Sequence, residues 1–101
     1  MITICNLRNE RMKFEYDVIV DRASILGNIY YMYSEEQRDE VCDKYEEYFN
    51  KQVKENIKFK NELDRLINIY NKYGELRLFC WCYPRRCHAI TIKNYILQNC
   101  N

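Results

Sequence analysis

The stretch ELRLFCWCYPRRCHAI, residues 75–90, decides how this chain folds, because it joins a strand to a helix through one short loop. Successive side chains of a strand point to opposite faces. Here both faces are largely apolar: Leu76, Leu78 and Cys80 share one, and Arg77, Phe79 and Trp81 share the other. A strand that is apolar on both faces is typical of the centre of a sheet. We therefore expect residues 75–81 to form a central strand.

The second half of the stretch predicts a loop and then a helix. The segment CYPRR contains the only proline of the chain and marks the loop. We expect the helix to run from Cys87 or His88 to about Gln98, because apolar residues recur there with the helical period. Its buried side is formed by Ala89, Ile92 and Ile96.

Four further elements are predicted before this stretch. Residues 2–5 and 16–20 are apolar and rich in β-branched side chains, which favours strands. A helix is expected to begin at Ser34 with Gln37 at the capping-box spacing, and a second helix to end at Gly74. Residues 1–101 should therefore be one small α/β domain in the order β-β-α-α-β-α, with a parallel or mixed sheet of about three to four strands and helices packed on it.

Composition excludes several classes of protein. The net charge is +1 and the pI is about 7.5, so we expect no binding to a nucleic-acid polymer. No apolar run approaches the roughly 20 residues that span a bilayer, and no signal peptide is visible. We expect a cytoplasmic protein with free thiols, no disulfides, no membrane partner and no cofactor. The 10 tyrosines favour an aromatic pocket or a self-association surface, which makes a homodimer plausible.

Three interpretations of residues 80–88 remain open from the residues alone. Cys80, Cys82, Cys87 and His88 are legitimate zinc ligands, although four ligands within one short loop are cramped. Cys87 at a helix start, beside two arginines and an imidazole, is a possible nucleophile, although buried cysteine is more often a small apolar side chain. The third interpretation is an anion pocket, and we favour it over a metal site.

The anion pocket follows from where the loops must lie. Ligands of α/β sheets bind at the carboxyl ends of the strands, where loops lead into helices. There Arg85 and Arg86 offer guanidinium groups, and the helix start offers unpaired N–H groups. If the strands run parallel, Arg22 after the second strand and His88 converge on one crevice.

The segment LRLFCWCYPRRCHA also resembles the C-terminal signature of an uncharacterised family of small bacterial and phage domains. That signature is a strand ending in C-x-C-x-P-x-x-C-H, followed by a helix. The N-terminal half is similar as well, in Asn6-Leu7-Arg8 and in Arg22 followed by Leu26-Gly27-Asn28. The chain differs from the family's tendency at Asp21 and Ile29, where glycine and proline are usual.

The resemblance implies a compact α/β fold and a shared site. The site residues expected from the resemblance and the loop chemistry together are Asn6, Arg22, Asn28, Cys82, Arg85, Arg86 and His88. Their arginines would neutralise a phosphate, the asparagines would supply directional hydrogen bonds, and the imidazole would donate to an oxygen.

The expected function is that of a phage-type accessory protein in the host cytoplasm. It would bind, and by analogy sequester, a phosphate-bearing nucleotide-like molecule to counter host defence signalling. The alternatives are a hydrolase or transferase acting on a nucleotide or glycosidic bond through Cys87, His88 or Asp21, and a protein-interaction module, stabilised by zinc or binding a host factor.

Overall fold

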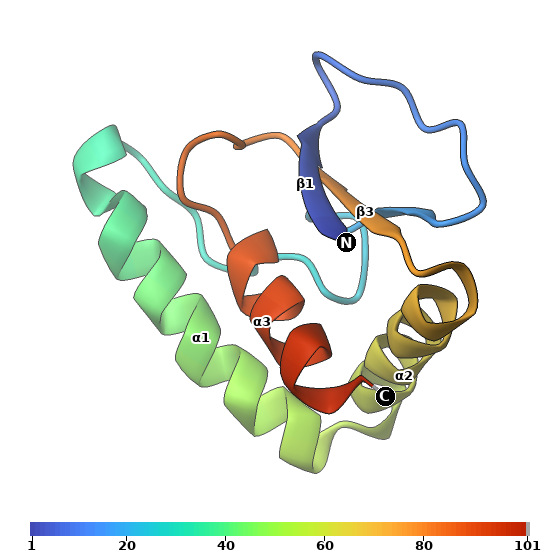
Figure 1. Ribbon diagram of the computed structural model, residues 1–101. Coiled ribbons are helices and arrows are strands. Elements are labelled where there is room, and N and C mark those ends of the chain that lie inside the picture. The colour runs from blue at the N-terminus through green and yellow to red at the C-terminus, as the bar shows by residue number, and fades with distance from the viewer. Residues whose placement is uncertain (101) are drawn as a thin grey trace.

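The computed structural model describes residues 1–100, in which three parallel strands and three α-helices follow one another in the predicted order β-β-α-α-β-α (Figure 1). The elements are β1 (Ile2–Asn6), β2 (Asp17–Ile19), a 3-10 turn η1 (Glu35–Gln37), α1 (Arg38–Glu55), α2 (Ile57–Tyr73), β3 (Leu76–Cys80) and α3 (Ala89–Asn99). The strand order in the sheet is β1-β3-β2. The α/β prediction is therefore confirmed.

The strand β3 is central, as its two apolar faces predict. It pairs in parallel with β1, from Ile2 opposite Leu76 onward, and in parallel with β2, where Val18 lies opposite Leu78. Whether the first two strands pair with each other was open from the sequence. They do not, because β3 lies between them. All three strands consequently end at the same edge of the sheet.

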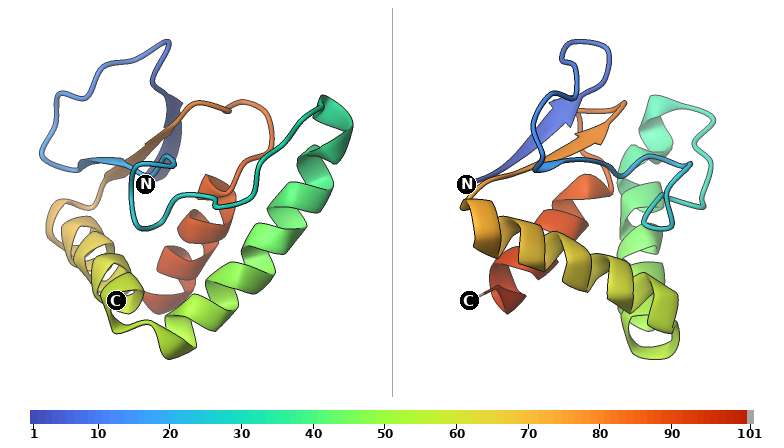
Figure 2. Two further views of the ribbon diagram at one scale, coloured as in Figure 1. Left: turned by 180° about the vertical axis from the view of Figure 1, so that it is seen from behind. Right: turned by 90° about the vertical axis from the view of Figure 1, so that its right-hand side faces the viewer.

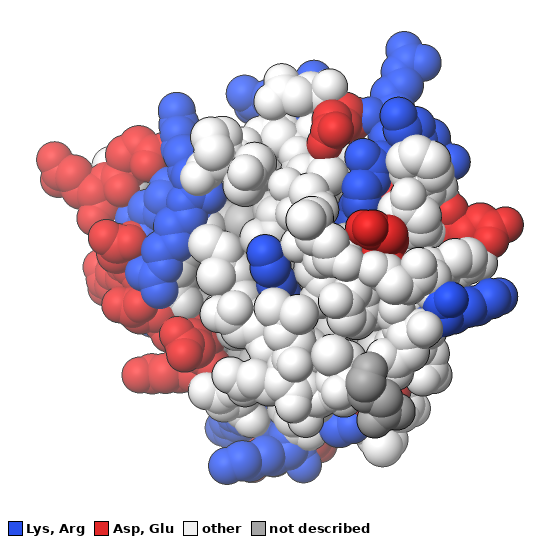
Figure 3. All heavy atoms as spheres, viewed as in Figure 1, with Lys and Arg blue, Asp and Glu red and all other residues white. Residues whose placement is uncertain are grey.

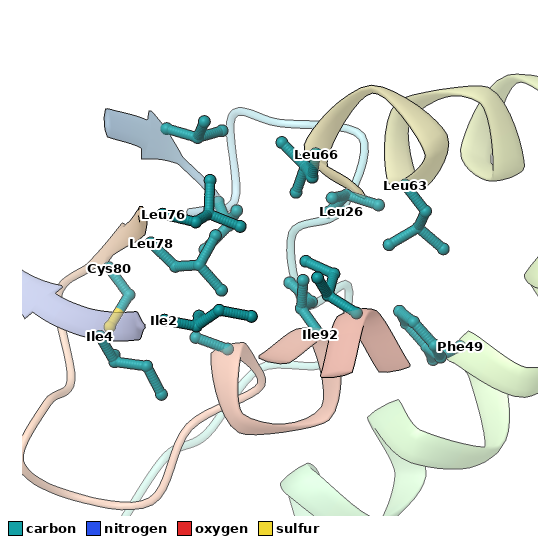
Figure 4. Close-up of a cluster of buried hydrophobic side chains, with 14 of the residues drawn as sticks. Ile2, Ile4, Leu26, Phe49, Leu63, Leu66, Leu76, Leu78, Cys80 and Ile92 are labelled. Carbon is teal, nitrogen blue, oxygen red and sulfur yellow. The ribbon is translucent and has the colours of Figure 1, made fainter. Parts of the chain in front are cut away.

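The helices cover one face of the sheet, and the core lies between the two layers (Figures 1 and 2). The sheet contributes Ile2, Leu76 and Leu78, and Figure 4 shows these side chains directed toward those of the helices. The helices contribute Phe49, Leu63, Leu66, Ala89, Ile92 and Ile96. Burying a side chain of this size contributes about 1.5–3 kcal/mol, so this layer contact is the main favourable term for the fold.

Of the helix ends, the one at Gly74 was predicted from the sequence, the cap at Asn56 was not, and the start at Ser34 differs from the prediction. Asn56 is extended, and its side-chain oxygen accepts from the amides of Lys58 and Phe59 at 3.1 and 3.3 Å, so it caps α2. Gly74 ends α2 with a left-handed φ of 69°. The capping box predicted at Ser34 is wrong: that hydroxyl makes no cap bond, and a 3-10 turn precedes α1.

The other face of the sheet is covered by the β1–β2 connection rather than by a helix. Arg77 in β3 reaches across this face and forms two bonds to the carboxylate of Asp17, of 2.7 and 2.9 Å. Its guanidinium lies 5.0 Å from the ring centroids of both Phe14 and Phe79. The amides of Lys13 and Phe14 donate to the same carboxylate at 2.8 and 2.9 Å. This ion pair therefore fastens the connection to the sheet.

Burial by itself would raise the pKa of Asp17. The bonds from Arg77 and from the two backbone amides outweigh burial and lower that pKa below its usual value. The carboxylate thus stays charged, and its contribution to stability is present above its unfolded pKa and is lost as the pH falls through the lower folded value.

The ion pair yields a stability prediction. Asp17→Asn should lower the free energy of unfolding by about 3 kcal/mol, because it leaves the shielded guanidinium of Arg77 without its counter-charge. Urea unfolding followed by circular dichroism measures this loss. The control is Glu40→Gln, which removes an exposed partner of Lys44 and should cost less than about 1 kcal/mol. Equal losses in the two variants would contradict the assigned role.

Candidate functional site

A cavity of about 280 Å³ lies at the edge where the three parallel strands end. This is the position at which open α/β sheets bind ligands. The segment after β2, the first turns of α1, the loop after β3 and the start of α3 each contribute to its wall. The lining residues are Asp21, Arg22, Asn28, Met32, Arg38, Val41, Cys42, Trp81, Cys82 and His88.

The segment after β2 is held in place by Arg22. The guanidinium of Arg22 donates to the carbonyl oxygens of Asn28 and of Tyr30, the latter at 2.7 Å, and it lies 4.7 Å from the centroid of the Tyr31 ring. From α1, the hydroxyl of Tyr45 donates to the carbonyl of Leu26 at 2.7 Å. These bonds fold the segment back over the strand ends, which forms one side of the cavity.

His88 lies at the N-terminal end of α3 with only 6% of its surface exposed. Its Nε2 is bonded to the carbonyl oxygen of Val20, and the ring packs edge-on against Tyr45 with centroids 5.2 Å apart. Burial lowers the pKa of the imidazole below its usual value, and the charge of Arg22 lowers it further; the Val20 bond and Asp21 act in the opposite direction without cancelling these effects. The ring is therefore neutral at neutral pH.

A carbonyl oxygen can only accept, so the single proton of the neutral ring must be on Nε2. Nδ1 then carries a lone pair. Neither Nδ1 of His88 nor Nδ2 of Asn28 has a hydrogen-bond partner within residues 1–100. In that range every buried side-chain nitrogen or oxygen has a hydrogen-bond partner, so these two unpaired atoms must be accessible to solvent. Both residues line the cavity, and we infer that the two atoms reach it.

Asn28 is held in a similar way to His88. Its Oδ1 accepts from the amide of Tyr30 at 2.8 Å, and only 7% of the residue is exposed. Because the oxygen is committed to the backbone, the amide nitrogen is the group left to face the cavity. Two side chains of opposite hydrogen-bonding character are thus fixed by backbone bonds before any ligand arrives.

The remaining wall combines an arginine, a thiol and an indole. Arg38 makes two bonds to Glu35, donates to the carbonyl of Arg86 at 2.9 Å and also lies against the thiol of Cys82. Trp81 donates through Nε1 to the carboxylate of Asp21 at 3.1 Å, and the residue, which is 52% exposed, lies at the mouth of the cavity. Val41, Met32 and Cys42 supply apolar surface.

Four of the seven predicted site residues line the cavity: Arg22, Asn28, Cys82 and His88. Three do not. Asn6 donates to the carbonyls of Trp81 and Tyr83 and accepts from the amide of Arg8, so it fixes the loop after β3. Arg85 forms an ion pair of 2.7 Å with Glu35, and Arg86 forms pairs of 3.1 and 2.8 Å with two aspartates of α1. Figure 3 shows the acidic groups gathered on the α1 side with basic side chains beside them.

The expected cradle of free N–H groups at the start of α3 is absent from residues 1–100. The amides of Ile90, Thr91 and Ile92 donate to the carbonyls of Cys87 or His88 at 3.1–3.4 Å. The amide of Ala89 donates to the sulfur of Cys87. That part of the prediction is wrong, because the residues before the helix cap its first turn internally.

The cysteines of the motif separate into two environments. Cys80 and Cys87 lie side by side in the core with their sulfurs 3.4 Å apart, whereas Cys82 faces the cavity. The hydrogen bond to Cys80 and burial both raise the pKa of Cys87, which keeps it in the thiol form; the same bond lowers the pKa of Cys80 to about 6. Among residues 1–100, no group of three or more His, Cys, Asp or Glu side chains is placed to hold a metal ion.

Sequence reasoning missed the contribution of α1, namely Arg38, Val41 and Cys42. The helical period identifies the face of α1 that includes Val41, but nothing in the sequence indicates that the start of this helix crosses the ends of the strands. In the part of the chain that the structure describes, none of the helices is long and apolar enough to cross a membrane.

Comparison with known protein families assigns the chain to one of them. Residues 5–98 match the family described as "Domain of unknown function (DUF4326)", so nearly the whole chain is covered and the protein belongs to this family. The predicted membership of an uncharacterised family is thereby confirmed. Searches of curated proteins and of solved structures give no match.

The turn that carries Asn28 gives a second stability prediction. A Cβ on Gly27 would lie 2.7 Å from the Cα of Arg22 and still closer to the carbonyl oxygen of Asp21, and these backbone atoms cannot rotate away. Gly27→Ala should lower the free energy of unfolding by about 1–3 kcal/mol and change the emission of Trp81, the only tryptophan.

Gly74→Ala is the matched control, because a Cβ there meets no atom within 4 Å and only the left-handed φ is strained. It should cost about 1–2 kcal/mol without changing the emission of Trp81. Gly27→Ala with native stability and native emission would show that the turn is not held as tightly as described.

His88 gives a pH prediction. Its pKa is lower in the folded chain than in the unfolded chain, so the unfolded state takes up the proton more readily. The free energy of unfolding should therefore fall as the pH falls through about 6.5, the usual histidine value. The pKa of Cys80 acts in the same direction, so urea unfolding at pH 7.5 and 5.5 is compared between the native chain and His88→Gln. An identical pH dependence in both would refute the buried neutral ring.

Proposed function

We propose that this protein binds a phosphate-bearing, nucleotide-like small molecule in the cavity at the strand ends. The observation that carries the proposal is a largely apolar hollow that is lined by two mostly buried polar residues, each with one unpaired nitrogen that reaches the hollow, and is bordered by two guanidinium groups. Sites for small ligands have this character: apolar walls with a few polar groups that fix orientation.

Arg22 is the group suited to the phosphate. Its hydrogen-bond partners are carbonyl oxygens, which carry no net charge. Within residues 1–100, no carboxylate forms a salt bridge with it. The positive charge of Arg22 is therefore not cancelled by a partner, and it lies exposed at the cavity mouth. A guanidinium in this state matches the geometry of a phosphate group.

The volume and the exposed indole suit one base and its sugar. A cavity of about 280 Å³ is slightly smaller than the range of about 300–1,000 Å³ that is typical of sites for drug-sized ligands. It favours a mononucleotide, or one half of a larger molecule, over a whole dinucleotide. Trp81 offers an aromatic face at the rim on which a base or sugar could stack.

Binding without turnover is favoured over catalysis through Cys87 by the position and the state of that thiol. Cys87, the nucleophile considered from the sequence, is held as a buried thiol in the core and does not line this cavity. A protein that sequesters its ligand needs no nucleophile. Sequestration, a role against host defence and a homodimer all remain predictions that follow from the resemblance and composition.

Titration of the protein with nucleoside monophosphates tests the proposal, with Trp81 fluorescence and calorimetry as readouts. Arg22→Gln should weaken binding about 10–100-fold, the loss expected for a charged hydrogen bond worth about 1.5–3 kcal/mol, and Arg22→Lys should retain more affinity because it keeps the charge.

The matched control is Arg85→Gln, which removes an exposed guanidinium outside the cavity and should leave the affinity unchanged. Chromatography of the recovered ligand should return it intact. No binding by any nucleotide, or equal loss in the two glutamine variants, would overturn the proposed site; reaction products would instead identify an enzyme.

A further inference from the structure

We infer that the ligand binds ring-first, with the hydrogen-bonding edge of a nitrogen heterocycle against Asn28 and His88 and its charged end at the mouth beside Arg22. This inference rests on the proposed function and deepens it, because it states which part of the molecule the interior of the cavity recognises. Burial gives the direction of entry: Asn28 and His88 are 7% and 6% exposed, whereas Trp81 at the mouth is 52% exposed.

The hydrogen-bond acceptor in the interior of the cavity is Nδ1 of His88. The bond from Nε2 to the carbonyl of Val20 fixes both the tautomer and the orientation of the ring, and Tyr45 packs against its side. A neutral imidazole held in this way offers a lone pair to the cavity. The sequence had suggested a donor at this position, but the only N–H of the neutral ring is already used inside the protein.

The donor of the interior is Nδ2 of Asn28. Its amide orientation is set by the bond between Oδ1 and the amide of Tyr30, at 2.8 Å. The backbone carbonyl of the same residue accepts from Arg22, so the segment is held from both sides. A side chain fixed in this way loses little freedom when a ligand binds, which favours affinity.

The acceptor on His88 and the donor on Asn28 together determine which chemical groups of a ligand can bind in the interior of the cavity. A fully ionised phosphate has hydrogen-bond acceptors but no donor. A phosphate oxygen next to the lone pair of Nδ1 would therefore be repelled. The ring amides and amidines of nucleobases present a donor and an acceptor on one edge, and they satisfy both groups. An unpaired buried polar group costs about 1–3 kcal/mol, so rings without such an edge should be rejected.

The walls between the interior and the mouth are suited to a flat ring. Val41, Met32 and Cys42 line the cavity with apolar surface, and the indole of Trp81 lies toward its opening. Arg22 also lines this space, and it is exposed where Asn28 and His88 are buried. A nucleobase inside with its phosphate outside therefore meets complementary surfaces along its whole length.

The test compares ligands that differ at the ring edge. Adenosine and uridine monophosphates are titrated beside their N6,N6-dimethyl and 3-methyl counterparts, which have lost the N–H donors of that edge. The preferred base should bind at least tenfold more tightly than its methylated form. Ribose 5-phosphate and inorganic phosphate, which lack the ring, should bind at least a hundredfold more weakly than the preferred nucleotide.

The protein-side variant is Asn28→Asp, which keeps an oxygen for the amide of Tyr30 but replaces the donor by an acceptor. It should weaken binding of the preferred nucleotide at least tenfold. Asn68→Asp makes the same charge change on the exposed side of α2 and should leave binding unchanged. Circular dichroism shows whether each variant is folded; if Asn28→Asp does not fold, the methylated ligands decide the question on the native chain.

The outcomes separate this inference from the function on which it rests. Binding of ribose 5-phosphate or inorganic phosphate as tightly as a nucleotide would overturn the ring-first orientation while leaving an anion site in place. Equal affinity for a base and its methylated form would overturn it as well. No affinity for any of these probes would overturn the proposed nucleotide-binding function itself.

Discussion

Burial of β3 on both of its faces is the constraint on which the rest of the structure depends. A strand that must be covered twice can only lie between other strands, and here it takes β1 and β2 as parallel neighbours. On one face the helices bury Leu76 and Leu78. On the other face Arg77 holds the β1–β2 connection over Phe79, mainly through its ion pair with Asp17. Because all three strands run in one direction, their carboxyl ends open at one edge, and the cavity lies there.

The cavity is shaped mainly by side chains that bond to backbone carbonyls. Arg22 holds the carbonyls of Asn28 and Tyr30, Asn6 holds those of Trp81 and Tyr83, and the imidazole of His88 holds that of Val20. The loops of a domain with only 101 residues have little core beneath them. Polar side chains that cross from one loop to the next replace that core and give the loops fixed positions. The same bonds decide which polar atoms are left for a ligand.

The sequence was sufficient for the fold and for part of the site. The two apolar faces of residues 75–81 predict the central strand, and the helical spacing of Ala89, Ile92 and Ile96 predicts the buried side of α3. Convergence of Arg22 and His88 followed from parallel strands, and both residues line the cavity. The contribution of α1 did not follow, because it depends on how far a helix extends across the sheet. The partners of Arg85 and Arg86 did not follow either, because they are set by that same packing.

The hydrogen-bond partners of the arginines show why an arginine near a strand end does not by itself identify an anion site. Arg38 and Arg85 share the carboxylate of Glu35, and Arg86 bonds to two aspartates of α1, so each of these guanidinium groups has a negatively charged partner. Arg22 bonds to carbonyls, which satisfy its donors but leave its charge in place. Long-range attraction for a phosphate depends on the net charge and not on the number of hydrogen bonds already made. Of the four guanidinium groups near the site, the one with neutral partners is therefore the group that can attract an anion to the mouth, while the others hold the loop after β3 against α1.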